Sequence, residues 1–98
     1  MMTLTRRPDE SILIGEHLTV TVTDVDPSGV RLMIDGELIG GPDDGMIIRE
    51  ARELAINGEV RIGSLVTLTV VAIRGKQAKM GIVAPKQIAV QRKELLDR

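Results

Sequence analysis

Residues 18–34 read LTVTVTDVDPSGVRLMI, and this stretch decides the fold. From Leu18 to Val25, apolar side chains largely alternate with Thr and Asp, the pattern of a β-strand with one buried face. The four residues from Asp26 to Gly29 have Pro second and Gly fourth, as type I turns prefer. Residues 30–34 then return as a second strand, so the stretch predicts a β-hairpin.

The same hairpin pattern recurs in the second half of the sequence, which makes the chain an internal repeat. Residues 62–83 read IGSLVTLTVVAIRGKQAKMGIV and align without a gap on residues 14–35. Identical residues occur at Ile14 and Ile62, Gly15 and Gly63, Thr19 and Thr67, Thr21 and Thr69, Val22 and Val70, and Ile34 and Ile82. Further on, Pro42 matches Pro85 and Arg49 matches Arg92, with a longer loop in the first copy.

The length and the order of patterns predict one compact domain over residues 1–98. Strands are expected over 1–7, 10–14, 45–49, 59–62 and 87–91, beside hairpins over 17–35 and 65–83. Residues 50–57 are rich in helix formers and end in Asn57, which is followed by Gly58, a common end of a helix. They therefore predict a helix, and a shorter helix is expected over 92–98. The first copy, residues 1–57, then has a degenerate last strand, and the second copy, residues 58–98, lacks a first strand.

Charge is divided unevenly between the two copies. Residues 1–57 carry five Arg against eleven acidic residues, a net charge of −6. Residues 58–98 carry eight Lys or Arg against three acidic residues, a net charge of +5. The second copy is therefore the one expected to meet a polyanion, unless the division of solvated charges arose by chance.

Composition excludes several classes of protein. The absence of Cys removes disulfides and thiolate metal sites and favours a reducing compartment. No apolar run is long enough for a membrane span, and Arg6 and Arg7 come too early for a signal peptide, so we expect a cytoplasmic protein. Phe, Tyr and Trp are also absent, so bases would be held by Arg, backbone groups and phosphate contacts instead of aromatic stacking.

The sequence predicts no catalysis, no metal and no cofactor. His17 is the only histidine, and there is no Cys to share a metal with it. Asp43 and Asp44 lie between glycines with no adjacent base, which favours a solvated turn over an acid pair. The glycines lack the spacing of phosphate-binding loops. We therefore expect a protein that is not an enzyme.

Two stretches resemble the carbon storage regulator family (CsrA/RsmA). Residues 4–15 read LTRRPDESILIG and are similar to the start of the family, except that Asp9 stands where the family has glycine. Asp tolerates the left-handed backbone conformation that such a turn needs. Residues 74–94 read RGKQAKMGIVAPKQIAVQRKE and are similar to its end without a gap. The resemblance covers nearly the whole chain and is weakest over residues 36–58.

The resemblance implies a fold and a function. Members of this family are small dimeric β-proteins that bind GGA-containing loops in messenger leaders and small RNAs, typically repressing translation. In their dimers, the first strand of one subunit lies beside the last strand of the other, and each junction is an RNA site. The repeat then implies a mainly β, CsrA-like small barrel or sandwich of antiparallel strands with short helices. This would be a single-chain pseudo-dimer with residues 1–7 against residues 86–92.

The resemblance also implies which residues bind RNA. They are Leu4, Thr5, Arg6, Arg7, Ala84, Pro85, Lys86, Ile88, Val90 and Arg92. Guanidinium groups can clamp phosphates and fork to guanine edges, although solvated arginines at strand ends are the alternative. Alternation alone would instead make Leu4, Ile88 and Val90 core residues. In the first copy, Asp43 and Asp44 stand in place of Lys86 and Gln87 and would repel phosphate, so one working site is expected.

Two alternatives remain open. A strand-exchanged homodimer would treat residues 36–63 as an insertion and pair residues 1–7 with residues 86–92 of another chain. A protein-binding or antagonist module on the same fold would use the acidic half to engage a partner.

Overall fold

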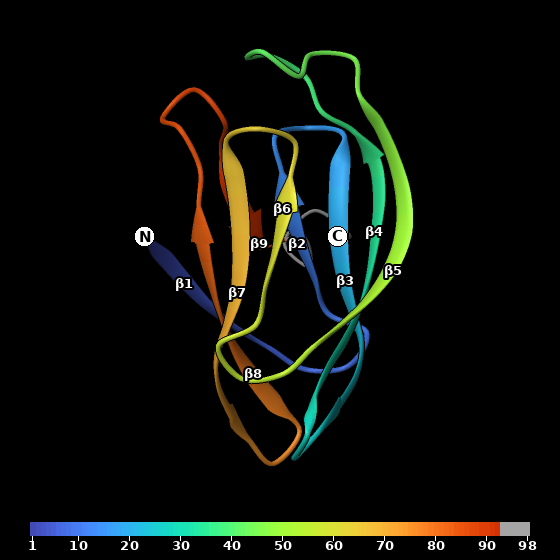
Figure 1. Cartoon of the computed structure of the whole chain (residues 1–98), viewed down its shortest axis with the longest axis vertical. Helices are drawn as coiled ribbons and strands as arrows, with labels where there is room; N and C mark the ends of the chain where they lie inside the picture. Colours follow the sequence, from blue (N-terminus) through green and yellow to red (C-terminus); the bar gives the residue numbers. More distant parts are fainter. Residues whose placement is uncertain (93–98) are drawn as a thin grey trace.

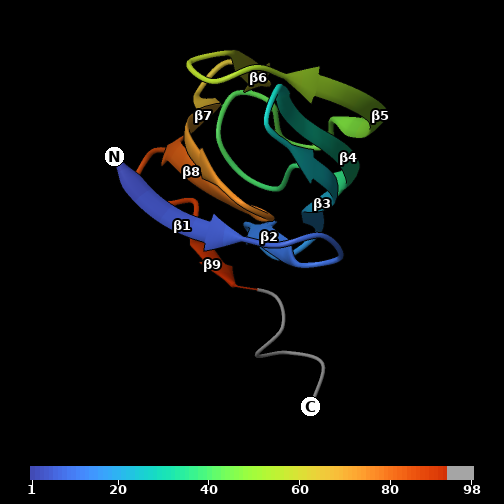
Figure 2. The same ribbon diagram turned by 90° about the horizontal axis from the view of Figure 1, so that it is seen from below.

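The computed structural model describes residues 1–92, which form nine β-strands in two antiparallel sheets (Figure 1). The strands are β1 (Met2–Arg6), β2 (Ser11–Ile14), β3 (Leu18–Asp26), β4 (Gly29–Glu37), β5 (Ile47–Leu54), β6 (Glu59–Ile62), β7 (Val66–Arg74), β8 (Gln77–Val83) and β9 (Val90–Arg92). One sheet has the order β1-β8-β7-β6 and the other the order β5-β4-β3-β2-β9. The sheets curve around a shared interior (Figure 2). This confirms the predicted CsrA-like antiparallel β fold.

Both predicted hairpins are confirmed. β3 pairs with β4 up to Asp26 opposite Gly29, and β7 pairs with β8 up to Arg74 opposite Gln77. Each hairpin has a register shift at the equivalent place, between Val22 and Asp24 in β3 and between Val70 and Ala72 in β7. The turn of the first hairpin is held by the Asp26 carboxylate, whose Oδ1 accepts hydrogen bonds from the next residues of the turn.

The core between the sheets is built from aliphatic side chains and Met80. Because side chains alternate across a strand, every second residue of the hairpins points inward. Burying each large aliphatic side chain contributes about 1.5–3 kcal/mol relative to exposure. The fully buried large side chains are Ile12, Ile14, Leu18, Leu32, Ile34, Ile62, Leu68, Met80, Ile82, Val20, Val22 and Val25. Within residues 1–92, Arg6 is the only buried charged residue, at 3% exposure.

The two repeats exchange their first strands. β1 pairs with β8, from Met2 opposite Ile82 to Arg6 opposite Ala78. Residues 50–54 of β5 pair with β4 in the equivalent register, ending with Leu54 opposite Val30. Residues 50–54 therefore occupy on β4 the place that residues 2–6 occupy on β8.

The turns after these two strands agree with the exchange. Asp9 and Asn57 occupy equivalent positions in the two repeats, and both have positive φ values, 74° and 70°. The amide of Asp9 donates to Val22 O at 2.6 Å, and that of Asn57 donates to Val70 O at 2.7 Å. The left-handed turn expected at Asp9 is thus confirmed.

Two sequence predictions are wrong here. Residues 50–57 are not a helix but the end of β5 and the turn after it, because hydrogen bonding along β4 outweighs the helix propensity of the segment. The second copy also has an equivalent of the first strand, so the second structural repeat starts within β5 and not after Asn57. The helix expected over 92–98 lies, apart from Arg92 in β9, outside the described residues.

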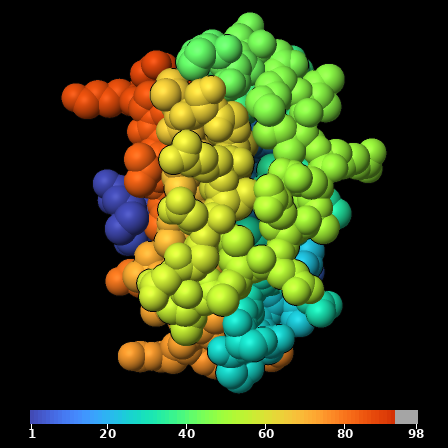
Figure 3. Space-filling view, viewed as in Figure 1, coloured from blue at the N-terminus to red at the C-terminus, as the bar shows by residue number. Residues whose placement is uncertain are grey.

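The last strands break the symmetry. β9 pairs with β2, from Ile12 opposite Arg92 to Ile14 opposite Val90. β6 corresponds to β2 but has no strand on its outer side within residues 1–92. In Figure 3 the yellow atoms of β6 lie at the front beside the green atoms of β5. No helix in the described part of the chain is long and apolar enough to cross a membrane.

Candidate nucleic-acid interface

Two sheet edges come together where β1 and β9 lie near each other (Figure 2). Among residues 1–92, each strand ends its own sheet and is hydrogen-bonded to one neighbouring strand, β1 to β8 and β9 to β2. An edge strand leaves a row of backbone N–H and C=O groups free for another molecule. Residues 1–7 and 86–92 thus approach each other as two sheet edges, and no ladder of hydrogen bonds joins β1 to β9.

The start of the chain and the loop before β9 line one hollow. In Figure 3 the blue atoms of the first residues lie against the orange and red atoms near the end of the chain. The hollow is lined by Met1, Met2, Ile82, Val83, Ala84, Pro85, Lys86, Ile88 and Val90. The structure thus brings together the two ends of the chain that the sequence assigns to one site.

On β1, side chains alternate between the core and the solvent. Leu4 packs partly against the core, and Thr5 is exposed opposite Lys79. Arg6 is buried, with Nε donating to Thr5 O at 2.7 Å and Nη1 donating to Ser11 O at 3.3 Å. Its Nε also lies 3.9 Å from Glu10 Oε1. Arg6 therefore fixes the turn between β1 and β2 instead of facing solvent.

Arg7 is exposed and is oriented by two neighbours. Its amide donates to Glu10 Oε1 at 2.7 Å, which places the residue at the end of β1. With the Gln77 carboxamide oxygen turned toward it, the Arg7 guanidinium donates through Nε at 3.2 Å and Nη2 at 2.6 Å. Arg7 thus extends from β1 toward the hairpin of β7 and β8.

The segment before β9 is anchored at both ends. The Ile88 amide donates to Pro85 O at 3.0 Å, and the Gly15 amide donates to Ala89 O at 2.7 Å. Ile88 is 8% exposed and belongs to the core, as alternation alone suggests. Its burial holds the loop against the sheets, so that Lys86 beside it stays exposed.

The candidate residues therefore fall into three groups. Thr5, Arg7, Lys86 and Arg92 are exposed. Leu4, Ala84, Pro85 and Val90 are half-buried, and all of them except Pro85 pack against the core. Arg6 and Ile88 are buried. The arrangement offers cations, free backbone groups and a small apolar surface, which is the chemistry that single-stranded RNA requires where aromatic residues are absent.

The site residues predicted from the sequence begin at Leu4 and leave out Met1 and Met2, although the expected contact segment, residues 1–7, includes both. A Cβ at Gly81 in β8 would lie 2.7 Å from Met1 Sδ, so Met1 lies over a position that has no side chain. A glycine inside a strand signals such a close approach, and Gly81 was the available clue. Sequence reasoning also missed that Gln77 orients Arg7.

The corresponding loop in the first copy carries two acidic side chains that accept hydrogen bonds from backbone amides. Asp43 Oδ2 accepts from the Ser64 amide at 2.6 Å, and Asp43 Oδ1 accepts from Ser64 Oγ at 3.1 Å. Asp44 Oδ1 accepts from the Gly40 amide at 2.6 Å. The Asp43 carboxylate holds the loop onto the turn after β6, and the Asp44 carboxylate closes the loop on itself. At the matching place the second copy has a basic segment that leads into a strand.

Within residues 1–92, no group of three or more His, Cys, Asp or Glu side chains is placed to hold a metal ion. His17 is exposed, with Nε2 4.0 Å from Glu16 Oε2.

The sequence matches known proteins in each of its two copies. The CsrA family, described as a global regulator protein family, matches residues 1–51 and again residues 54–98. The translational regulator CsrA of Exiguobacterium sibiricum is 50% identical over 36 residues, which are 37% of this chain and 48% of that protein. The translational regulator CsrA of Bacillus subtilis is 45% identical over 40 residues, 41% of this chain and 54% of that protein.

The chain spans about half the length of these curated relatives. No solved structure matches it. The two family matches together cover nearly the whole chain, one in each half. The chain belongs to the CsrA family of global regulators.

Proposed function

We propose that this protein is a cytoplasmic, non-enzymatic RNA-binding regulator that acts after transcription. It binds GGA-containing loops in messenger leaders or small regulatory RNAs and mostly represses translation. The observation that carries the proposal is the pair of free sheet edges, β1 and β9, flanked by exposed cations in a chain of the CsrA family. The names of the two relatives, both translational regulators, support it.

The free edges supply the specificity in this proposal. Backbone N–H and C=O groups of β1 and β9 meet the Watson–Crick edges of unstacked bases, while exposed Thr5 leaves room for them. Lys86 and Arg92 neutralise phosphates or fork to guanine. Buried Arg6 acts indirectly, because it holds the end of β1 in place through Ser11.

The proposal includes one site per chain and a monomeric particle. β1 already pairs with β8 of its own chain, so a second chain is not needed to complete this edge. The equivalent place beside β6 has no last strand within residues 1–92 and carries Asp43 and Asp44 nearby. A strand-exchanged homodimer would instead carry two sites, with β1 of each chain on β8 of the other.

A titration with a GGA-loop RNA hairpin tests the site number and the particle together. We expect saturation at one RNA per chain and sedimentation of a monomer at micromolar protein concentration. A stable dimer with two RNA sites would replace the single-chain arrangement. No shift of the RNA at micromolar protein in low salt would refute RNA binding itself.

Arg92→Ala tests the position of the site. We expect binding to weaken by about 1–3 kcal/mol, the scale of a good contact to a base edge. Arg49→Ala is the matched control, because Arg49 is its sequence counterpart in the first copy and lies near Asp35, with a 3.8 Å separation. Equal losses in the two variants would remove the site from β9.

Salt dependence separates RNA binding from a protein-binding or antagonist role. Contacts to single-stranded RNA make log K fall with log salt concentration by about 0.7 per neutralised phosphate. We expect a steep slope that becomes shallower in Arg92→Ala. A salt-independent interaction with RNA would instead favour the protein-binding alternative.

A further inference from the structure

A basic hollow lies on the outer face of the four-stranded sheet, at the closed end of the β7–β8 hairpin. Its lining consists of Thr5, Ala72, Arg74, Gln77 and Lys79, and the name basic hollow refers to this set below. Lys79 is paired with Thr5 on one side and Ala72 on the other, so its exposed side chain lies between β1 and β7. Within residues 1–92, no carboxylate forms an ion pair with Arg74 or Lys79.

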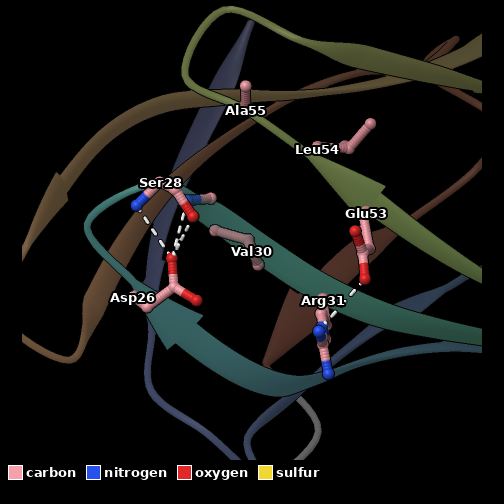
Figure 4. A pocket seen from close by; sticks show the side chains of 8 residues that line it. Asp26, Ser28, Val30, Arg31, Glu53, Leu54 and Ala55 are labelled. Atoms are coloured by element: carbon pink, nitrogen blue, oxygen red, sulfur yellow. Dashed lines mark hydrogen bonds and ion pairs between the residues drawn. The ribbon is translucent and has the colours of Figure 1, made fainter.

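The internal repeat provides a second copy of this hollow with different charges. Figure 4 shows it at the turn of β3 and β4, where Asp26, Arg31 and Glu53 line it. The alignment of the two repeats places Asp26 at the position of Arg74, Arg31 at that of Lys79, and Glu53 at that of Thr5. We call this copy the acidic hollow.

In the acidic hollow the single cation is neutralised. Arg31 Nε lies 3.0 Å from Glu53 Oε1. Asp26 Oδ1 accepts from the Ser28 amide at 2.8 Å and from the Gly29 amide at 3.1 Å. The hydrogen bond from the Ser28 hydroxyl, together with these amides, holds the pKa of Asp26 below its usual value. The acidic hollow therefore carries a net negative charge.

The comparison shows that the hairpin does not need unpaired cations to fold. The β3–β4 hairpin keeps the same register and the same bulge with Asp26 at the position of Arg74 and with Arg31 paired. The stability of the hairpin thus does not explain why Arg74 and Lys79 have no ion-pair partner among residues 1–92.

Lys76, on the same turn, serves a different purpose. Its Nζ donates to Val25 O at 3.0 Å and lies 3.9 Å from Asp24 Oδ1, so it ties the second hairpin to the first. Lys76 therefore does not belong to the basic hollow, although it follows Arg74 closely in the chain. It offers a control with the same charge in the same hairpin.

We propose that the basic hollow binds phosphates of RNA nucleotides that flank the loop held between β1 and β9. The inference rests on the proposed function and extends it along β1. The hollow shares Thr5 with the β1 edge, and its Gln77 accepts hydrogen bonds from the Arg7 guanidinium. The four residue steps from Met2 to Arg6 span about 13 Å, so an RNA that reaches the hollow must extend beyond the bound loop.

Two RNAs distinguish this subsite from the loop site. One is an oligonucleotide of about six nucleotides that contains GGA, and the other is a hairpin with the same loop and a paired stem. In the Arg74→Ala, Lys79→Ala double variant, we expect hairpin affinity at low salt to fall about tenfold. The slope of log K against log salt should fall by about 1.4, equivalent to two phosphates. Affinity for the short oligonucleotide should stay within about twofold.

The controls separate the possible failures. Lys76→Ala should leave both affinities within about twofold, because Lys76 is directed toward β3. Arg92→Ala should weaken both RNAs. Equal effects of the double variant on both RNAs, or no effect on either, would overturn the basic hollow as a flanking subsite. If neither RNA binds the unaltered protein, the proposed function fails and the subsite with it. Thermal unfolding of each variant checks that the fold is retained.

Discussion

Ile88→Ala separates a core role from an RNA-contact role at one residue of the site. Ile88 is 8% exposed and packs in the core, while its amide closes the loop onto Pro85 O at 3.0 Å. If this structural role is the main one, the substitution lowers stability and leaves RNA affinity nearly unchanged.

The size of the effect follows from the burial. Replacing Ile by Ala removes three carbon groups, which at about 0.8 kcal/mol each amounts to about 2.4 kcal/mol of lost burial. A residual cavity adds to this loss, so we expect the free energy of unfolding to fall by about 2–4 kcal/mol. For a chain of 98 residues, the melting temperature should drop by roughly 10 °C or more.

Urea and thermal unfolding measure the loss, and RNA titration below the melting transition measures affinity. Val83→Ala is the control for stability, because Val83 lines the same hollow but is 51% exposed, and its loss should stay under about 0.5 kcal/mol. The reasoning would be refuted if Ile88→Ala unfolded like the unaltered protein but lost RNA affinity. Ile88 would then contact RNA directly.

Three further predictions concern the frame of the fold. Gly36→Ala would place a Cβ 2.0 Å from His17 O at a φ of +136°, so we expect a loss of about 3 kcal/mol or more, and an unchanged urea midpoint would contradict this. Asp43→Ala removes the carboxylate that accepts from the Ser64 amide at 2.6 Å, so the free energy of unfolding in urea should fall by about 1 kcal/mol. RNA affinity should not weaken, and a weaker affinity would place Asp43 in the site. The pKa of Asp26 is lowered chiefly by the hydroxyl of Ser28, so its ionised form stabilises the fold above the pKa of the unfolded chain. This contribution is lost as the pH falls through the lowered pKa of Asp26, so in Asp26→Asn the stability should decline less steeply below about pH 4. Identical profiles of stability against pH for the variant and the unaltered protein would contradict this prediction.

The hairpins and the repeat could be predicted because their signals are local. Alternation over residues 18–25 and the turn at Asp26 need no information from the rest of the chain. The left-handed turn at Asp9 was accessible in the same way, because few residues accept a positive φ. The basic character of the second copy, which contains the last strand, followed from counting the charged residues in each copy.

The strand over residues 50–54 could not be predicted from its own sequence. Its residues are mostly good helix formers, and Leu54 is the only buried side chain among them, so no alternation signals a strand. The segment is a strand because β4, which pairs with β3 on its other side, offers it a free edge for hydrogen bonding. The burial of Arg6 could not be predicted locally either, because it depends on the hydrogen bond to Ser11 O and on the turn between β1 and β2.

By itself, the sequence determined the antiparallel hairpins, the duplication and the basic character of the last-strand segment, because periodicity, turn chemistry and charge are properties of neighbouring residues. Only the tertiary structure decided the exchange of first strands, the open outer edge of β6 within residues 1–92, and the burial of Arg6. It also decided that Arg74 and Lys79 share one hollow with Thr5. These features arise from hydrogen bonds and packing between segments far apart in the chain, which a local pattern does not record.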